Sequence, residues 1–319
     1  MHVLVTGGSG FIGSHLISRL KKQNPETRIS VVDRNEPESR IAGVDYDISD
    51  VLESSKLNEW IKTADFVYHL AALVSVAKSQ ESPLESHKDT VETTKHILDL
   101  LTELKSKTKK APSLIYSSTA AIYGDSVKTE SDYSLESFQP HDFLSNYAKH
   151  KFEAEELLRA VHKFHALNCC VFRFFNVYGP GQDPKSPYSG VVSIYIDRLK
   201  NNLPLSINGD GKQTRDFIYV DDIISGLMRI IEVERTSSAW NGMPINLGSG
   251  SSINILFLTK TLIDLTSSKV SPHFAPARDG DVRHSRAETK RARELLSFRS
   301  TIDLKTGLRL LLKHQAQQK

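Results

Sequence analysis

Short apolar runs alternate with longer segments of mixed polarity over the first half of the chain. Apolar runs of this length are typical of buried strands, and the segments between them are long enough for helices. Such alternation of strands and helices predicts a parallel sheet with helices on both faces. The expected strands cover residues 2–6, 29–33, 66–70, 113–118 and 169–174, and the longest expected helices cover 87–104 and 147–164.

The pattern changes after about residue 175. A loop rich in turn formers runs from Gly179 to Pro184, and the apolar segments that follow it are shorter. They predict a helix at 191–200, a strand near 216–220 and a helix at 222–233. We therefore expect a second, smaller α/β region in the C-terminal half.

A glycine-rich turn joins the first expected strand to the first expected helix. The segment from Thr6 to Gly13 reads Thr-Gly-Gly-Ser-Gly-Phe-Ile-Gly. The first glycine permits a tight turn, the second lets the backbone approach a pyrophosphate, and the third lets helix and strand pack closely. Asp33 ends the second strand twenty residues after Gly13, where an acid would hold an adenosine ribose. The dinucleotide-binding residues expected in the turn are Gly7, Gly10, Phe11, Ile12 and Gly13.

The fold that these patterns predict is α/β, with a Rossmann-type doubly wound parallel sheet and a smaller C-terminal α/β domain. Residues 1–174 are expected to form the first domain, to which segments near 214–247 also contribute. Residues 175–319 are expected to form most of the second, so the chain interleaves between the two. In such a sheet, ligands bind at the carboxyl ends of the strands.

Composition narrows the class of protein. Of the 319 residues, 39% are hydrophobic and 25% are charged, as expected for a globular protein, and the net charge of +3 is too small to imply a nucleic-acid or membrane partner. No apolar segment approaches the ~20 residues that span a bilayer. The chain enters a strand directly, which leaves no room for a signal peptide. Neighbours on a strand point to opposite faces, so Cys169 and Cys170 predict neither a disulfide nor a metal site, and we expect a cytoplasmic location.

Tyr147 and Lys151 are four residues apart at the start of an expected helix and so share one face. A tyrosine with its ordinary pKa of ~10 is a poor base near neutrality. A neighbouring ammonium and a positively charged nicotinamide would both favour tyrosinate and lower its pKa. Thr119 follows an expected strand, and its hydroxyl could bond a substrate hydroxyl or carbonyl. The alternative interpretation is a core tyrosine near a surface lysine.

Further motifs follow in order along the chain: His69-Leu70-Ala71-Ala72, Ser117 to Gly124, Arg173 to Pro180, Arg215-Asp216-Phe217, and Arg278 to Asp281. In this combination the chain resembles an extended short-chain dehydrogenase/reductase of the nucleotide-sugar 4-epimerase type, over nearly its whole length. The resemblance implies that the first domain binds NAD and that the second binds the nucleotide sugar.

The resemblance also implies roles for individual residues. Asp33 matches the acid that selects NAD over NADP, although an arginine such as Arg34 could meet a 2′-phosphate. The other implied NAD contacts are Asp47, Ile48, Leu70, Ala71, Ala72, Tyr147 and Lys151. The implied catalytic residues are Tyr147, Lys151 and Thr119. The residues implied to bind a UDP-sugar are Ser75, Thr119, Tyr147, Asn176, Arg215, Arg278, Asp281 and Ser285; no metal is implied.

The two residues after Thr119 help to distinguish the reactions of this family. Nucleotide-sugar 4,6-dehydratases carry an Asp-Glu pair there and the related decarboxylase carries a glutamate, whereas Ala120 and Ala121 cannot move protons. The implied reaction is inversion at C4 of a UDP-hexose through a transient 4-keto sugar, with tightly bound NAD. The alternatives are an NAD(P)-dependent reductase of a 4-keto nucleotide sugar and a catalytically silent dinucleotide-binding sensor.

Two positions bear on the substrate. Ser285 matches the family's gatekeeper, and a small residue there leaves room for an N-acetyl group, so UDP-GlcNAc and UDP-GalNAc are expected, with or without UDP-Glc and UDP-Gal. A surface serine in a loop is the alternative interpretation. Asn208 stands where the family often has an aromatic that stacks on uracil, which weakens the case for uridine. The helices at 87–104 and 147–164 resemble those of a dimer interface in relatives, so a homodimer is expected.

Overall fold

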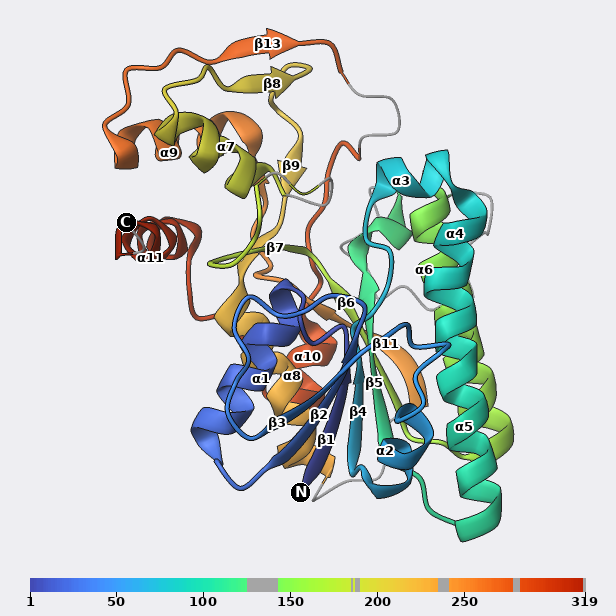
Figure 1. The fold of residues 1–319 in the computed structure, drawn as a ribbon. Coiled ribbons are helices and arrows are strands. Elements are labelled where there is room, and N and C mark those ends of the chain that lie inside the picture. Colours follow the sequence, from blue (N-terminus) through green and yellow to red (C-terminus); the bar gives the residue numbers. More distant parts are fainter. Residues whose placement is uncertain (125–142, 185, 187–189, 235–240, 278–281, 318–319) are drawn as a thin grey trace. The chain divides into compact units, whose positions relative to one another are not determined.

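A computed structural model describes residues 1–124, 143–184, 186, 190–234, 241–277 and 282–317 (Figure 1). The chain divides into two compact units, each made of three segments. Unit 1 consists of Met1–Thr119, Asn146–Arg173 and Leu227–Ile245, and unit 2 consists of Ala120–Ser145, Phe174–Gly226 and Asn246–Lys319. The assignment of NAD binding to one domain and substrate binding to the other stays a prediction.

Unit 1 is built on a seven-stranded sheet. Its strands are β1 (His2–Thr6), β2 (Arg28–Asp33), β3 (Val44–Ile48), β4 (Phe66–His69), β5 (Ser113–Thr119), β6 (Cys169–Phe174) and β11 (Asn241–Leu247). They lie in the order β11-β6-β5-β4-β1-β2-β3, and β5, β4, β1, β2 and β3 pair in parallel. The predicted Rossmann-type α/β fold is confirmed.

The central strands are apolar on both faces because helices cover both. Every residue of β1 and β4 is buried, as expected for a parallel sheet of this kind. In Figure 1, α5 and α6 lie together on one side of the sheet and α1 lies on the other. The helices of this unit are α1 (Phe11–Gln23), α2 (Leu57–Thr63), α3 (Val76–Glu81), α4 (Pro83–His87), α5 (Thr93–Thr108), α6 (Asn146–His165) and, from Leu227 onward, α8 (Val220–Glu234).

The expected helix at 87–104 is wrong in its bounds. A π-helical turn, η1 (Lys88–Glu92), separates α4 from α5, and the Thr93 N–H donates to the Lys88 carbonyl five residues back. A π turn accommodates one extra residue in a helix and often lies at functional sites. The polar and apolar pattern cannot reveal it, because both helices keep their apolar faces.

The expectations also omitted two strands of the sheet. β3 is an edge strand whose residues are exposed or only partly buried, so it carries no apolar run. β11 contains Gly242 and Pro244, two residues that are depleted in strands. Both strands exist because neighbouring strands offer hydrogen-bonding partners, which local sequence does not record.

Unit 2 contains three short two-stranded sheets. They are β7 (Asn176–Tyr178) with β10 (Phe217–Tyr219), β8 (Ser206–Asn208) with β13 (His273–Ala275), and β9 (Thr214–Arg215) with β12 (Ile253–Asn254). Its helices are η2 (Ala120–Tyr123), α7 (Val191–Lys200), α8 as far as Gly226, α9 (Ile255–Thr266), α10 (Lys290–Leu296) and α11 (Leu304–Gln317).

Asp216 joins separate segments of unit 2. Its buried carboxylate accepts the N–H groups of Ser249, Gly250 and Ala287 at 2.7, 2.8 and 3.0 Å. A buried charge is tolerated when hydrogen bonds replace its hydration, so this aspartate ties two other backbone segments, at residues 249–250 and 287, to the residue after Arg215. Among the helices that the structure describes, none is long and apolar enough to cross a membrane.

Candidate functional site

The glycine-rich turn lies between β1 and α1. Gly7 has a φ of +74°, which residues with side chains rarely adopt, and a Cβ there would lie 2.6 Å from a backbone nitrogen. A Cβ on Gly13 would lie 2.3 Å from the Gly7 carbonyl oxygen, because helix and turn approach closely. Gly10 is the N-cap of α1 and supplies no capping side chain. The N–H groups of residues 11–13 therefore have no partner within the helix and present a positive dipole end.

Asp33 at the end of β2 contacts this turn. Its carboxylate accepts the Ser9 N–H at 3.0 Å and the Asn35 N–H at 2.9 Å. Burial raises the pKa of Asp33, and the bonds from Asn35 and Ser9 oppose that shift. The Ser9 hydroxyl is buried and has no hydrogen-bond partner in the part of the chain that the structure describes. The turn thus brings together the fixed Asp33 carboxylate and the Ser9 hydroxyl, which is available to bind a ligand.

Arg34, the next residue, is bound by two carboxylates. Its Nη1 and Nη2 donate to the two oxygens of Asp89 at 2.7 and 2.6 Å. Its Nε and Nη2 donate to Oδ2 of Asp50 at 2.9 and 2.5 Å. The arginine that could have met a 2′-phosphate therefore has carboxylate partners from its own chain.

The other expected cofactor residues lie at neighbouring strand ends of unit 1. Asp47 is in β3, and its Oδ2 accepts the hydroxyls of Ser49 and Ser54 at 3.0 and 2.6 Å. Ile48 is the last residue of β3. Leu70, Ala71 and Ala72 directly follow β4, and the Leu70 N–H donates to the carbonyl of the last residue of β1 at 3.0 Å. These segments meet at one edge of the sheet because their strands are parallel.

This edge fits a dinucleotide in its chemistry. An uncapped helix N-terminus with no acidic residue in its first turn suits a pyrophosphate. The Ser9 hydroxyl can donate to a phosphate oxygen, and the Asp33 carboxylate can accept from ribose hydroxyls. A side chain at Gly7 or Gly13 would fill the turn with a Cβ that clashes with backbone. The residues present therefore fit NAD.

Tyr147 stands in the first turn of α6 and is fixed at both ends. Its N–H donates to Ser79 Oγ at 3.0 Å, so α3 holds the start of α6. Its hydroxyl is hydrogen-bonded to Thr119 at the end of β5. Burial raises the pKa of Tyr147, and the bond from Thr119 opposes the shift. The bond from Thr119 therefore favours tyrosinate, and the contributions of the neighbouring ammonium and of a nicotinamide stay predictions.

Lys151 lies one helical turn further along α6 and is buried. Its Nζ donates to the Ser117 carbonyl at 2.7 Å and lies 4.8 Å from the centre of the Tyr116 ring. Burial lowers the pKa of Lys151 to about 7, and the Glu155 carboxylate opposes this shift. The lysine is thus held by β5 through a backbone carbonyl, and its charge is sensitive to its surroundings.

Behind Lys151 lies a buried ion pair. Arg173 Nε and Nη2 donate to the two oxygens of Glu155 at 2.9 and 2.6 Å, and the Ser118 hydroxyl donates to the same carboxylate. Both charged side chains are 2% exposed. Neither Glu155 nor Ser79 was among the residues that the sequence predicted for the site. The spacing of four residues from Lys151 to Glu155 was a usable signal, whereas nothing local marks Ser79.

Ser75, expected to meet the sugar, is the N-cap of α3. Its Oγ accepts the Lys78 N–H at 3.0 Å, and the residue is 2% exposed. A capping hydroxyl keeps its own proton for donation elsewhere. Ala120 and Ala121 open η2 and are partly buried, so the two positions directly after Thr119 carry no acid or base.

Three expected substrate residues come together in unit 2. The Asn176 amide Nδ2 donates to the Asp216 carbonyl at 3.2 Å, which ties β7 to the residue after Arg215. The Ser285 N–H donates to the Thr214 carbonyl at 3.2 Å, so Ser285 lies beside β9 and is partly buried. Arg278 and Asp281 lie outside the described residues. The roles of all these residues stay predictions.

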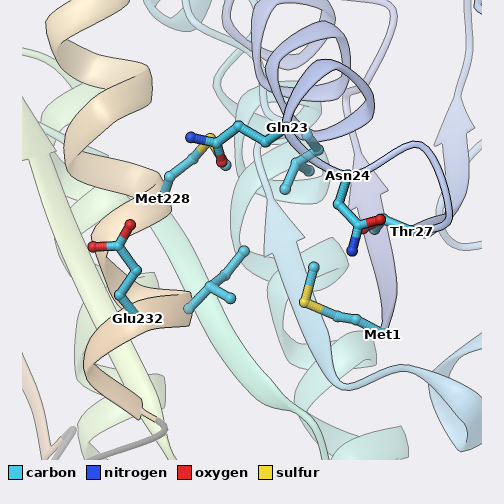
Figure 2. Close-up of a pocket in the computed structure, with 8 residues that line it drawn as sticks. Met1, Gln23, Asn24, Thr27, Met228 and Glu232 are labelled. Atoms are coloured by element: carbon cyan, nitrogen blue, oxygen red, sulfur yellow. The ribbon is translucent and has the colours of Figure 1, made fainter.

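A small pocket in unit 1 lies at the opposite end of the sheet (Figure 2). Met1 precedes β1 and Thr27 precedes β2, so the pocket opens at the amino ends of the strands. Its lining consists of Met1, Leu20, Gln23, Asn24, Thr27, Met228, Ile231 and Glu232. Ligands of open α/β sheets bind at the carboxyl ends, so this pocket is not part of the candidate site. The described residues contain no group of three or more His, Cys, Asp or Glu side chains placed to hold a metal ion.

Comparisons with known proteins agree with this geometry. The model of the NAD dependent epimerase/dehydratase family matches residues 3–248. The chain is 32% identical to a putative UDP-glucose 4-epimerase of Methanocaldococcus jannaschii over 317 residues, which cover 96% of each protein.

Solved structures are similar over the full length. A UDP-glucose 4-epimerase of Thermotoga maritima, determined with UDP-glucose, has a TM-score of 0.89 and 29% identity, covering 100% of this chain and 99% of that one. A UDP-N-acetylglucosamine 4-epimerase of Methanobrevibacter ruminantium, in complex with UDP-N-acetylmuramic acid, has a TM-score of 0.88 and 29% identity with the same coverage.

Proposed function

The chain belongs to the NAD dependent epimerase/dehydratase family, whose cofactor is NAD, and we propose that it inverts C4 of a UDP-hexose. The observation that carries this proposal is the hydrogen bond between Thr119 and the Tyr147 hydroxyl beside the buried Lys151. It provides a phenol whose proton can be moved and whose anion a donor stabilises. The chain is similar to a putative UDP-glucose 4-epimerase and to a UDP-glucose 4-epimerase whose structure contains UDP-glucose, and this similarity supports a UDP-hexose as substrate.

In the proposed reaction NAD, when bound, supplies the hydride acceptor and donor at C4 and a positive charge that favours tyrosinate. Tyr147 removes the proton of the 4-hydroxyl as that carbon is oxidised. It returns the proton once the 4-keto sugar has turned its other face. Thr119 holds the phenolic oxygen, and Lys151 is fixed to the Ser117 carbonyl so that its Nζ stays near the same end of β5. No net redox change results.

The two positions directly after Thr119 distinguish the proposed epimerase from the dehydratases and the decarboxylase of this family. A dehydratase or a decarboxylase needs an additional side chain that moves protons, and Ala120 and Ala121 have none. A reductase of a 4-keto nucleotide sugar needs only Thr119, Tyr147 and Lys151, so it differs from the epimerase by consuming NAD(P)H.

The proposal extends to N-acetylated sugars through Ser285. The residue is small, partly buried and hydrogen-bonded to the strand that carries Arg215. In the resemblance it matches the gatekeeper position, where a large side chain would exclude the acetyl group. Ser285→Tyr should therefore lower turnover of UDP-GlcNAc more than that of UDP-Glc. Equal losses for both sugars would contradict the gatekeeper role.

The experiment that tests the reaction uses the purified protein without added cofactor. It is incubated with UDP-GlcNAc and separately with UDP-Glc, and the products are identified by NMR. Appearance of the 4-epimer supports the proposal. Turnover that requires added NAD(P)H and a 4-keto nucleotide sugar would replace it by the reductase, and inability to convert any nucleotide sugar would favour a silent sensor.

Tyr147→Phe is the matched variant for this assay. It keeps the ring and the backbone bond to Ser79 but removes the proton-transfer group. We expect turnover to be lost while NAD stays bound. The bound NAD is measured by releasing the cofactor from the purified protein and recording its absorbance. Full activity of this variant would rule out Tyr147 as the base.

A homodimer in the cytoplasm completes the proposal. The exposed faces of α5 and α6, which pack against each other, are the elements whose counterparts form the interface in the resemblance. The chain has a mass of 35.7 kDa, and light scattering after gel filtration should give twice this mass. Both cysteines are free and buried, and burial raises the pKa of Cys169 to about 12, so a reducing compartment is compatible with their chemistry.

A further inference from the structure

The end of β2 carries two residues with opposite preferences between NAD and NADP. Asp33 is placed to accept the ribose 2′-hydroxyl of NAD, while an arginine near this position accommodates the 2′-phosphate of NADP. Arg34 directly follows Asp33. The bond from the Ser9 N–H to Asp33 holds this strand end against the glycine-rich turn. Sequence therefore leaves the choice between the two cofactors open.

Arg34 has its hydrogen bonds committed to carboxylates. A guanidinium has five N–H donors. The structure directs four hydrogen bonds from Arg34 to Asp50 and Asp89, at 2.5 to 2.9 Å. The pairing with Asp89 is bidentate, with two nitrogens facing two oxygens, which is the same geometry by which arginine binds a phosphate.

The carboxylates are fixed more firmly than the arginine. The side chains of Asp89 and Asp50 are 8% and 14% exposed, whereas that of Arg34 is 46% exposed. Asp89 lies in the π-helical turn η1, and Asp50 follows β3, where its Oδ1 accepts the Leu52 N–H at 2.9 Å. Two separate backbone segments therefore hold the guanidinium, and it cannot leave without exposing both carboxylates to each other.

The net charge of this group also disfavours a 2′-phosphate. Asp33, Asp50 and Asp89 contribute three negative charges and Arg34 contributes one positive charge. A phosphate brought to this group would meet a surplus of negative charge and would have to displace charge-assisted hydrogen bonds already formed. The hydrogen bonds that Arg34 donates to Asp89 raise the pKa of the arginine and outweigh the opposing effect of burial, so the arginine stays charged and paired.

We propose that Asp50 and Asp89 are specificity residues that withhold Arg34 from a 2′-phosphate and thereby select NAD over NADP. The proposal concerns the cofactor of the family and does not depend on which sugar is converted. Its test reads binding rather than activity, so it stands or fails separately from the proposed reaction.

The test compares affinities of the cofactor-free protein for NAD and NADP by isothermal titration calorimetry at fixed salt. The decisive pair is Asp33→Asn against the triple variant D33N/D50N/D89N, because Asp33 itself repels a 2′-phosphate in every other background. Asparagine keeps the shape of each side chain and the bond from the Leu52 N–H. We expect the triple variant to bind NADP about tenfold or more tightly than D33N, with a change of less than about threefold for NAD.

Two further variants make the result specific to Arg34. Adding Arg34→Gln to the triple variant should remove the gain for NADP. D33N/D45N/D99N makes the same change of charge at two exposed carboxylates that do not contact Arg34, with side chains 60% and 61% exposed, and should show no gain. Equal NADP affinity of D33N and D33N/D50N/D89N, or a gain that survives loss of Arg34, would overturn the proposal. Circular dichroism of each variant checks that it is folded.

Discussion

Two arginines of unit 1 are each bound by carboxylates, at different depths. Arg173 and its partner Glu155 lie behind Lys151 and are both 2% exposed. Arg34 lies beside Asp33 and is 46% exposed, and it has two partners, Asp50 and Asp89. Each arginine makes short charge-assisted bonds, yet only Arg34 is also in contact with solvent.

The difference follows from desolvation. A buried charge that loses its partner cannot return to water, so removal of one member of the pair is costly. An exposed charge that loses its partner is rehydrated, and the net energy of such a pair is small. We infer that the Arg173–Glu155 pair fixes the segment around Lys151, whereas Arg34 with Asp50 and Asp89 acts on the proposed choice of cofactor. The following substitutions test this contrast.

Removal of one buried charge should have the largest effect. Glu155→Gln leaves the Arg173 guanidinium buried without a counter-charge and replaces one acceptor oxygen by an amide NH2, which only donates. We expect the free energy of unfolding to fall by about 3–5 kcal/mol, measured by urea denaturation followed by circular dichroism. Asp99→Asn, which breaks an exposed pair with Lys95 on α5, is the control and should change it by less than about 0.5 kcal/mol. Equal stability of the two variants would contradict the contrast.

Removal of both buried charges should cost less than removal of one. In E155Q/R173M neither position carries a charge, so part of the loss is recovered, by about 1–3 kcal/mol relative to Glu155→Gln alone. The same urea titrations give the coupling energy between the two positions. If the double variant were less stable than Glu155→Gln, the uncompensated buried charge would not be the cause of the loss.

The Thr119 hydroxyl should affect the pH dependence of turnover. It opposes the effect of burial by lowering the pKa of Tyr147. In Thr119→Val that pKa rises, the fraction of tyrosinate at neutral pH falls, and kcat should decrease about tenfold or more near pH 7 and less at higher pH. The measurement is the pH profile of kcat, whose rising limb should move to higher pH. A uniform loss at every pH would mean that Thr119 acts on substrate binding alone.

Loss of Arg34 should have the smallest effect on stability. Its partner Asp50 has a lowered pKa, because the bonds from Leu52 and Arg34 outweigh the effect of burial. A lowered carboxylate pKa stabilises the folded state above its unfolded pKa, near ~4, and this contribution is lost as the pH falls through the folded pKa. Arg34→Gln leaves the nearly buried Asp50 and Asp89 carboxylates without a counter-charge. It should therefore be less stable than the parent by about 1–3 kcal/mol at pH 7, with a difference that shrinks in acid as the carboxylates are protonated. A difference that persists unchanged at low pH would exclude this ionic origin.

The sequence by itself determined the class of fold and predicted that a dinucleotide binds at the first strand–helix turn. Alternating apolar runs are sufficient for a parallel sheet because its strands are buried on both faces, and the spacing from Gly13 to Asp33 is set by one strand–helix–strand unit. It also determined which chemistry is present, since a tyrosine and a lysine four residues apart share a helix face wherever that helix lies. The sequence patterns did not predict β3 and β11, which depend on hydrogen-bonding partners elsewhere in the chain, or η1, which interrupts two helices without changing their apolar faces.

Only the tertiary structure decided what the charged side chains do. Asp50 and Asp89 are 39 residues apart in the sequence, and no local pattern relates either of them to Arg34. The pKa of Tyr147 depends on burial and on a threonine that precedes it by 28 residues, and no local pattern predicts either contribution. Electrostatic energies depend on distance and on exclusion of water, and both are properties of the folded chain rather than of its order of residues.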